Sequence, residues 1–125
     1  MEAYEFIDAE AALIQYLKPW KASTQVPSTK PAEHILVARV GGTADWFMDR
    51  PMVTFIVSAL SWPAAADFAR RVRQKLMSAT ELGGLPVYRW VEIGGPARSP
   101  DPDTGDPRYQ FTLEFRVRGR NLTPA

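Results

Sequence analysis

The C-terminal part of the chain carries the clearest alternation of apolar and polar positions. In the stretch RYQFTLEFRVRG, apolar side chains recur at every second residue, at Tyr109, Phe111, Leu113, Phe115 and Val117. A period of two residues is that of a β-strand with one buried face and one solvated face. The pattern therefore predicts a strand from residue 108, with these apolar side chains in the core.

Three other apolar runs predict strands. HILVARVGG, which begins at residue 34, is short and ends in paired glycines, as suits a strand with both faces covered. MVTFIVSAL, from residue 52, is the run richest in β-branched and aromatic residues, which favours a central strand. VYRWVEI, from residue 87, predicts the third strand in chain order.

Two segments have helical periodicity. Residues 5–18 place Phe6, Ala9, Leu13 and Leu17 near one face, and Pro19 ends the segment. The second segment follows Ser61, a residue type that caps helix N-termini, and carries a proline in its first turn. Its predicted buried face consists of Ala65, Phe68, Ala69, Val72 and Leu76. Gly83 or Gly84 is expected to cap its C-terminal end.

The predicted order of elements is α-β-β-α-β-β. It indicates an α+β fold, formed by a single domain over residues 1–125. We expect one four-stranded sheet, mainly antiparallel or mixed, with the helices packed on one face. Residues 19–33, 41–51 and 94–108 lack periodicity or are rich in proline, glycine and aspartate, which predicts long loops.

The composition and charge of the chain argue against nucleic acid and membranes as partners. The chain has 125 residues, of which 46% are hydrophobic and 23% charged, and its net charge is +1. A charge so close to zero gives no bulk attraction to nucleic acid. No apolar run approaches the roughly 20 residues of a membrane span, so no membrane partner is expected. The N-terminus is acidic where a signal peptide is basic, which predicts a soluble protein of a cell interior.

The proline-aspartate segment GPARSPDPDTGDP invites a metal hypothesis. An EF-hand loop needs oxygen ligands at positions 1, 3 and 5, with Gly at 6 and Glu at 12. Counted from Asp101, position 5 is Gly105, position 6 is Asp106 and position 12 is Thr112, so the pattern fails. We therefore predict no metal and take Asp101, Asp103 and Asp106 as residues of a rigid, turn-rich loop. A looser oxygen site is the alternative.

Catalytic residue sets are hard to assemble from this sequence. The chain has no cysteine and one histidine, His34, at the start of an apolar strand. Most nucleophilic triads and metal sites need more than that. The glycine turns VGGTAD and ELGGLP lack the spacing of phosphate-binding or dinucleotide-binding loops. We therefore expect no enzymatic activity and no cofactor.

Clustered arginines support an alternative of a different class, a small DNA-binding module. Arg70, Arg71 and Arg73 lie on the second predicted helix, and Arg116 and Arg118 lie on the last strand. The aromatic residues that would stack on bases fall mostly on apolar faces. Basic helix faces are usually only solvated surface, so we rank this alternative below a role in protein contacts.

The segment DWFMD places Trp46, Phe47 and Met48 side by side in a predicted loop. Consecutive residues cannot all point into one core, so at least one of them is expected to protrude. Exposed aromatic and methionine side chains suit a protein–protein contact, to which Arg50 would add a charge. The alternative is a loop that folds back over the sheet edge. Trp20, in the proline-rich connection, raises the same question.

Taken in order, these motifs resemble the tail terminator proteins of long-tailed bacteriophages, in the form found in phages of actinobacteria. The resemblance spans about residues 7–119. It rests on ALIQYLK, VPSTKPAEHILVARVGG, DRPMVTFIVSA, AAADFARRVRQKL and GPARSPDPDTGDPRYQFTLEFRVRG. The last stretch, a proline-aspartate loop before an aromatic-alternating strand that ends in Arg-Gly, is the most specific. Other head–tail connector or neck proteins of similar size are the closest alternatives.

The resemblance implies a structural virion protein that assembles in the host cytoplasm. Such proteins form a ring, usually a hexamer, on the head-proximal end of the tail tube, where they stop polymerisation and present a surface to the head. The implied partners are further copies of the chain, the major tube protein, a head-completion protein and the genomic DNA in the ring's lumen. The expected contact residues are Trp46, Phe47, Met48, Arg50, Asp101, Asp103, Asp106 and Arg108. Arg70, Arg71, Arg116 and Arg118 are candidates to face DNA.

Overall fold

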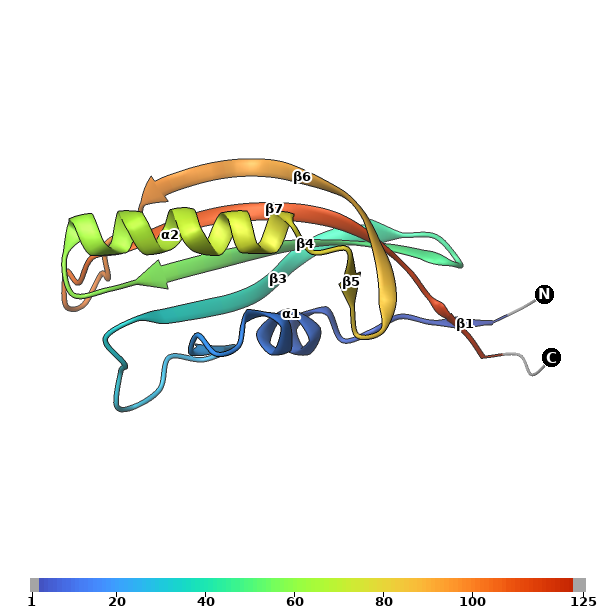
Figure 1. The fold of residues 1–125 in the computed structure, drawn as a ribbon, viewed down its shortest axis with the longest axis horizontal. Helices are drawn as coiled ribbons and strands as arrows, with labels where there is room; N and C mark the ends of the chain where they lie inside the picture. The colour runs from blue at the N-terminus through green and yellow to red at the C-terminus, as the bar shows by residue number, and fades with distance from the viewer. Residues whose placement is uncertain (1–2, 123–125) are drawn as a thin grey trace.

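The computed structural model describes residues 3–122 and is an elongated molecule built on four long strands (Figure 1). These strands lie in the spatial order β3-β4-β7-β6, and each is antiparallel to its neighbour. Their bounds are His34–Ala44 for β3, Met48–Ser58 for β4, Leu85–Arg98 for β6 and Arg108–Arg118 for β7. With helices α1 and α2, the long elements follow the predicted α-β-β-α-β-β order.

The prediction of a four-stranded sheet is incomplete. Strand β2 (Ala22–Ser23) pairs in parallel with the start of β3, and β5 (Glu81–Leu82) pairs with the start of β6, which makes a six-stranded sheet. Strands β1 (Tyr4–Glu5) and β8 (Arg120–Asn121) form a separate two-stranded sheet. Such short pairings are set by the surrounding tertiary structure, and two residues are too few to give a periodic sequence signal.

Both helices begin at a side-chain cap. Helix α1 (Ala9–Leu17) starts later than predicted because Asp8 caps it, with its Oδ1 accepting from the Ala11 N–H at 3.1 Å. Helix α2 (Trp62–Met77) is capped by Ser61 as predicted, through a 3.2 Å bond from the Ala64 N–H. The predicted glycine cap at the C-terminal end of α2 is not found. Gly83 and Gly84, with φ of 58° and 80°, instead form the turn between β5 and β6.

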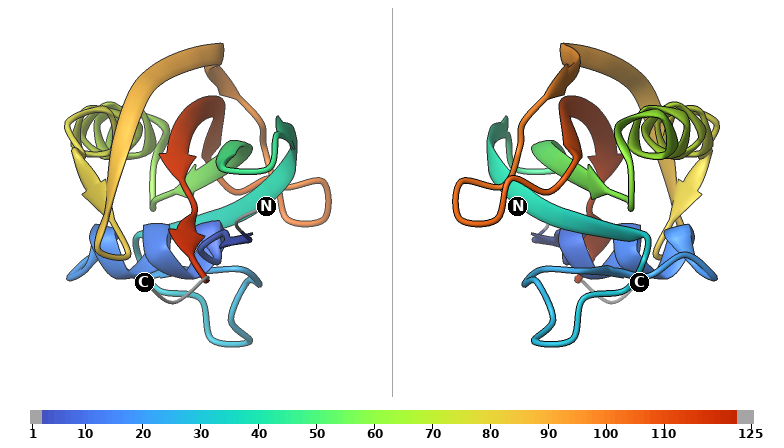
Figure 2. Two further views of the ribbon diagram at one scale, coloured as in Figure 1. Left: turned by 90° about the vertical axis from the view of Figure 1, so that its right-hand side faces the viewer. Right: turned by 90° about the vertical axis from the view of Figure 1, so that its left-hand side faces the viewer.

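The core lies between the helices and one face of the sheet. Viewed along the long axis, α1 and α2 lie on the same side of the curved sheet (Figure 2). The predicted alternation of β7 is confirmed, since Phe111, Leu113, Phe115 and Val117 are buried and Tyr109 packs against the core. The predicted inward face of α2 is also fully buried. The opposite face of the sheet carries half-buried side chains such as Thr54, Thr112 and Arg116.

Two of the predicted loops are shorter than expected, because the flanking strands extend into them. Most of the segment 41–51 continues the β3–β4 hairpin, which leaves residues 45–47 as its turn. The paired glycines sit at a bulge rather than at a strand end, and a Cβ on Gly42 would lie 2.0 Å from the Arg50 carbonyl oxygen. Strand β6 likewise extends to Arg98 through three register shifts, so the aspartate loop comprises residues 99–107.

Candidate functional site: contact surfaces at two ends of the sheet

The turn between β3 and β4, which we call the tip, is organised by Asp45. Its Oδ1 accepts hydrogen bonds from the backbone N–H groups of Phe47 at 3.1 Å and Met48 at 2.8 Å. Its Oδ2 forms a 3.2 Å ion pair with Arg50. The backbone N–H of Phe47 is the main reason why the pKa of Asp45 lies below its ordinary value. The turn therefore satisfies its own polar groups and holds Trp46 in a fixed position.

Trp46 is 56% exposed, whereas Phe47 and Met48 are half-buried. The expectation that at least one of these residues protrudes is therefore confirmed. The indole packs edge-on against Tyr4 of β1 and in a tilted arrangement against Phe47, with ring centroids 5.4 and 5.0 Å away. The Arg118 guanidinium lies 5.9 Å from the Tyr4 and Phe47 rings. Sequence reasoning missed Tyr4, because no periodic pattern links β1 to a turn so distant in sequence.

An ion pair with a buried carboxylate ties the base of the tip to the sheet. Asp49, only 1% exposed, accepts two hydrogen bonds of 2.8 Å from the Arg39 guanidinium. Asp49 is the main reason why the pKa of Arg39 lies above its ordinary value. Sequence reasoning also missed this pair, since Asp49 stands in a segment predicted as loop, where a carboxylate is normally solvated.

At the other end of the sheet, the aspartate loop (residues 99–107) closes on itself. Asp101 Oδ1 accepts from the N–H groups of Asp103 at 2.8 Å and Thr104 at 3.2 Å. The Gly105 N–H donates to the Asp101 carbonyl at 2.7 Å, in a turn where Gly105 has a φ of 73°. These bonds lower the pKa of the Asp101 carboxyl, with the Asp103 N–H as the largest cause. The loop is therefore an ordered turn.

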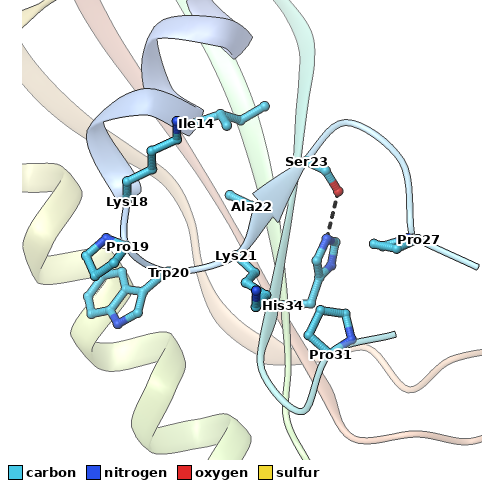
Figure 3. A pocket seen from close by; sticks show the side chains of 10 residues that line it. All are labelled: Ile14, Lys18, Pro19, Trp20, Lys21, Ala22, Ser23, Pro27, Pro31 and His34. Carbon is cyan, nitrogen blue, oxygen red and sulfur yellow. Dashed lines mark hydrogen bonds between the residues drawn. The ribbon is translucent and has the colours of Figure 1, made fainter. Parts of the chain in front are cut away.

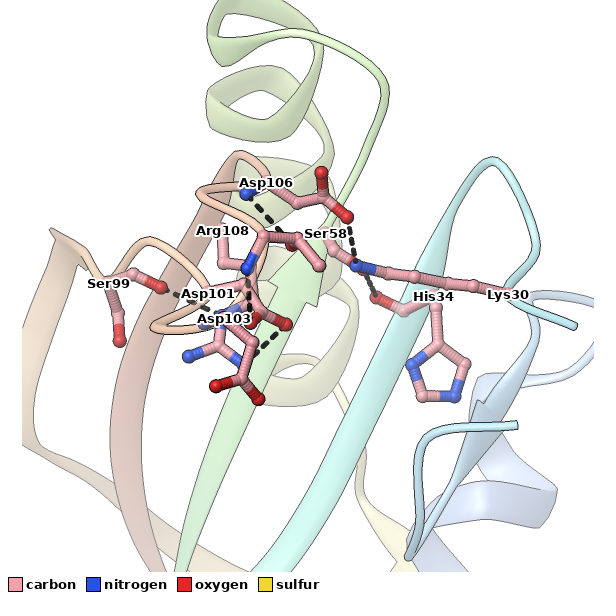
Figure 4. A network of polar contacts seen from close by, with 9 residues as sticks. Lys30, His34, Ser58, Ser99, Asp101, Asp103, Asp106 and Arg108 are labelled. Atoms are coloured by element: carbon pink, nitrogen blue, oxygen red, sulfur yellow. Dashed lines mark hydrogen bonds and ion pairs between the residues drawn. The ribbon is translucent and has the colours of Figure 1, made fainter. Parts of the chain in front are cut away.

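Ion pairs fasten the aspartate loop to its surroundings (Figure 4). Lys30 reaches Asp106 at 3.4 Å, and Arg108 lies 3.9 Å from Asp101 while its Nε donates to the Ser99 carbonyl at 2.8 Å. Of the predicted contact residues here, Asp101, Asp106 and Arg108 are thus held within the molecule. Asp103 is exposed, and within residues 3–122 its carboxylate forms no ion pair.

The tip and the aspartate loop lie at opposite ends of the molecule (Figure 1). Strand β4 begins beside the tip at Met48 and ends at Ser58, which pairs with Arg108 next to the loop. A strand rises about 3.3 Å per residue, so the 11 residues of β4 separate the two ends by roughly 30 Å. The predicted contact residues therefore form two surfaces that do not meet.

The candidate DNA-facing arginines are also separated. Arg70 and Arg71 lie on α2 and pair with Asp67 at 3.2 and 3.1 Å. Arg116 lies on the helix-free face of the sheet, because its neighbours in β7 point into the core on the helix side. Arg118 belongs to the aromatic cluster at the tip. No single basic surface contains all of these residues.

A groove lies beside the C-terminal end of α1, between it and the connection that leads to β3 (Figure 3). Its volume is about 490 Å³, and Trp20 and three prolines line it. His34, at one wall, is 2% exposed, and its Nε2 lies 2.8 Å from Ser23 Oγ. Burial lowers the pKa of His34, and the nearby Lys30 charge lowers it further. The histidine is thus held neutral by its surroundings.

The loop aspartates do not converge on a common point. Within residues 3–122, no three His, Cys, Asp or Glu side chains gather in an arrangement that could hold a metal ion. The same part of the chain contains no helix long and apolar enough to cross a membrane. No protein-family model matches the chain, and a search of curated proteins finds no matching relative.

Proposed function

We propose that this protein is a phage tail terminator: a ring that caps the head-proximal end of the tail tube, stops tube polymerisation and provides the surface for head joining. Its place would be the neck of the virion, and its partners would be further copies of the chain, the tube protein and a head-completion protein. The genomic DNA would pass through the lumen. The resemblance in the order and spacing of the sequence motifs suggests this role.

One structural observation supports it above the others. Two exposed surfaces of different chemistry, the aromatic tip and the aspartate loop, stand about 30 Å apart at the ends of one sheet. A protein placed between a tube and a head needs separate contact surfaces joined by a rigid body. A hydrogen-bonded sheet backed by a close-packed core provides that rigidity.

The tip has the chemistry of a lasting contact. Trp46 and its neighbouring rings offer apolar surface that water solvates poorly, and the Asp45 hydrogen bonds hold this surface in place before any partner arrives. A preorganised aromatic anchor loses little conformational entropy on binding. The aspartate loop, in which Asp101 and Asp106 already have partners and Asp103 is exposed, suits a contact that adds polar specificity.

The test is to delete the gene and view the resulting particles by electron microscopy. Without a terminator, we expect tubes of uncontrolled length and unjoined heads that still hold DNA. Complementation with the unaltered chain should restore tails of one length, whereas complementation with Trp46→Ala should restore fewer. Normal tails in the deletion strain would overturn the proposal and favour a head-side neck protein.

A further inference from the structure

The groove beside α1, which we call the Trp20 groove, has rigid apolar walls. Pro19, Pro27 and Pro31 line it together with Trp20. The ring of a proline fixes its backbone φ angle, so these walls have little freedom to rearrange. The Trp20 indole packs edge-on against Phe68 of α2, with ring centroids 5.4 Å apart and planes at 88°. Figure 3 shows these side chains around the opening. The groove therefore offers a preformed surface to an apolar ligand group.

Its rim is positively charged. Lys18 and Lys21 are exposed at the groove, and within residues 3–122 neither has a carboxylate within ion-pair distance. Lys75 extends the positive charge past Trp20, with its ammonium group 5.0 Å from the Tyr16 ring. The one carboxylate at the adjoining hollow, Glu33, is bound by Arg71 at 3.5 Å. An apolar floor with a cationic rim selects a ligand that is both apolar and anionic.

The aspartate loop has this complementary chemistry. Pro100 and Pro102 are exposed, and Asp103 beside them carries the free carboxylate of the loop. The hydrogen bonds to Asp101 hold the loop in one conformation, so that little entropy is lost on contact. Proline rings can pack on an indole, and a carboxylate can lie between two ammonium groups. We propose that the aspartate loop of one copy binds the Trp20 groove of a second copy.

The positions of the loop and the groove fit such a contact. Both lie toward the same end of the sheet, because His34 at the groove pairs with Ser58, which in turn pairs with Arg108 at the loop. Within one molecule the loop lies beside the proline-rich connection, where Lys30 binds Asp106 at 3.4 Å, while Lys18 and Lys21 at the groove and Asp103 on the loop stay exposed. A contact between two unlike surfaces is heterologous, and repeated heterologous contacts close rings when the rotation between subunits allows it.

This inference rests on the proposed ring and assigns the loop's docking role to the neighbouring copy. Its test is the self-association of the full-length chain, followed by sedimentation equilibrium. We expect Asp103→Lys, or Lys18→Glu with Lys21→Glu, to weaken association by about tenfold or more. An equimolar mixture of the loop variant and the groove variant should restore association between the two. The control is Glu81→Lys, an exposed charge reversal on β5 that should change nothing.

A second measurement avoids any dependence on charge-reversed variants that fail to fold. The natural chain has no cysteine, so Asp103→Cys and Lys21→Cys can be oxidised selectively. Mixing the two variants should give a disulfide-linked heterodimer, and pairing either one with Glu81→Cys should not. Equal cross-linking in both mixtures would overturn the contact.

The two proposals can fail separately. Association that survives both charge reversals would overturn this contact and leave the ring itself intact. Failure of the natural chain to associate at any concentration at which it stays dissolved would also overturn the contact as a self-sufficient one. The terminator role would still be decided by tail length in the deletion strain.

Discussion

The tip and the aspartate loop are both connections between antiparallel strands, but they differ in which polar groups are satisfied and which side chains are exposed to solvent. The tip satisfies its polar groups with one carboxylate, Asp45, and leaves an aromatic side chain, Trp46, in water. The loop satisfies its backbone with Asp101, turns Asp106 toward Lys30 and exposes prolines and one free carboxylate. The tip thus offers exposed apolar surface to a partner, whereas the loop satisfies its backbone internally and offers prolines and the Asp103 carboxylate.

The two connections also differ in how they are tied to the body of the protein. The base of the tip depends on Asp49, a carboxylate almost removed from water and paired with Arg39. The loop depends on pairs such as Lys30–Asp106, in which both side chains are partly solvated, with 28% and 48% of their surface exposed. Exposed pairs contribute little to stability, whereas breaking a buried pair strands a charge in the interior. Changes at the tip should therefore cost more than changes at the loop.

The largest effect is expected for Arg39→Met, which leaves the Asp49 carboxylate buried without its partner. We expect the free energy of unfolding to fall by about 2–3 kcal/mol in urea denaturation, less than for a fully buried pair because Arg39 is partly solvated. The control is Lys30→Met, which removes an exposed pair at the loop end and should cost less than about 1 kcal/mol. Equal losses would erase the distinction between the two ends.

A smaller effect on folding is expected for Trp46→Ala. The indole is mostly exposed, so its removal forfeits little more than the ring contacts with Tyr4 and Phe47, about 1 kcal/mol. Thermal unfolding would measure this loss. A destabilisation of several kcal/mol would instead identify Trp46 as a core residue and remove the argument that the tip is a contact surface.

The loop end should respond to pH near neutrality through His34. Its pKa is lowered in the folded protein by burial and by the charge of Lys30, and the imidazole faces Ser23. As the pH falls through the unfolded-state value of about 6.5, the unfolded chain binds the proton first, so stability declines. Melting temperatures measured from pH 7.5 to 5.5 should therefore decrease.

The matched control for this pH response is His34→Gln, which removes the only histidine of the chain. Its melting temperature should change less over the same range. The carboxyl groups of Asp45 and Asp101 have lowered pKa values, so the stability that they contribute is lost only at more acidic pH. An unchanged slope in the variant would contradict the assignment to His34.

The smallest effect on folding is expected when residues 100–107 are replaced by Asn-Gly. This pair favours a tight hairpin turn, and Ser99 and Arg108 already face each other through the Ser99 N–H bond to the Arg108 carbonyl at 2.9 Å. Because loop length affects stability only slowly, urea denaturation should change by less than about 1 kcal/mol. Self-association should be lost, since Asp103 goes with the loop. A chain that unfolds would show that the loop supports the sheet.

The parts of the fold that depend on local sequence patterns, such as strand alternation and helix capping, could be predicted from the sequence. The alternation of β7 gave its buried face because a strand with one solvated side imposes a two-residue period. Ser61 and the apolar spacing after it predicted α2. The prediction of a loop from residue 41 was wrong, because it took the paired glycines Gly41 and Gly42 as the end of the strand. Both instead belong to β3 next to a bulge, and at Gly42 the opposite strand comes too close for a side chain.

The candidate surfaces were less predictable, because they depend on which segments meet in space. Exposure at DWFMD followed from simple geometry, since three consecutive side chains cannot share one core. Tyr4, whose ring packs against Trp46, lies before helix α1 in the sequence. The pairing of β1 with β8 brings it near the tip. The burial of Asp49 depends likewise on tertiary packing, which neither composition nor spacing encodes.

The pairing of β1 with β8 has a practical consequence for microscopy. Strands β1 and β8, the first and last elements that the structure describes, lie beside the tip and far from the aspartate loop (Figure 1). A gold-binding or fluorescent tag fused to either terminus would therefore mark the same pole of each subunit, and a tag inserted into the loop would mark the other. Comparing the two labels along a tail would give the polarity of the protein within the particle directly.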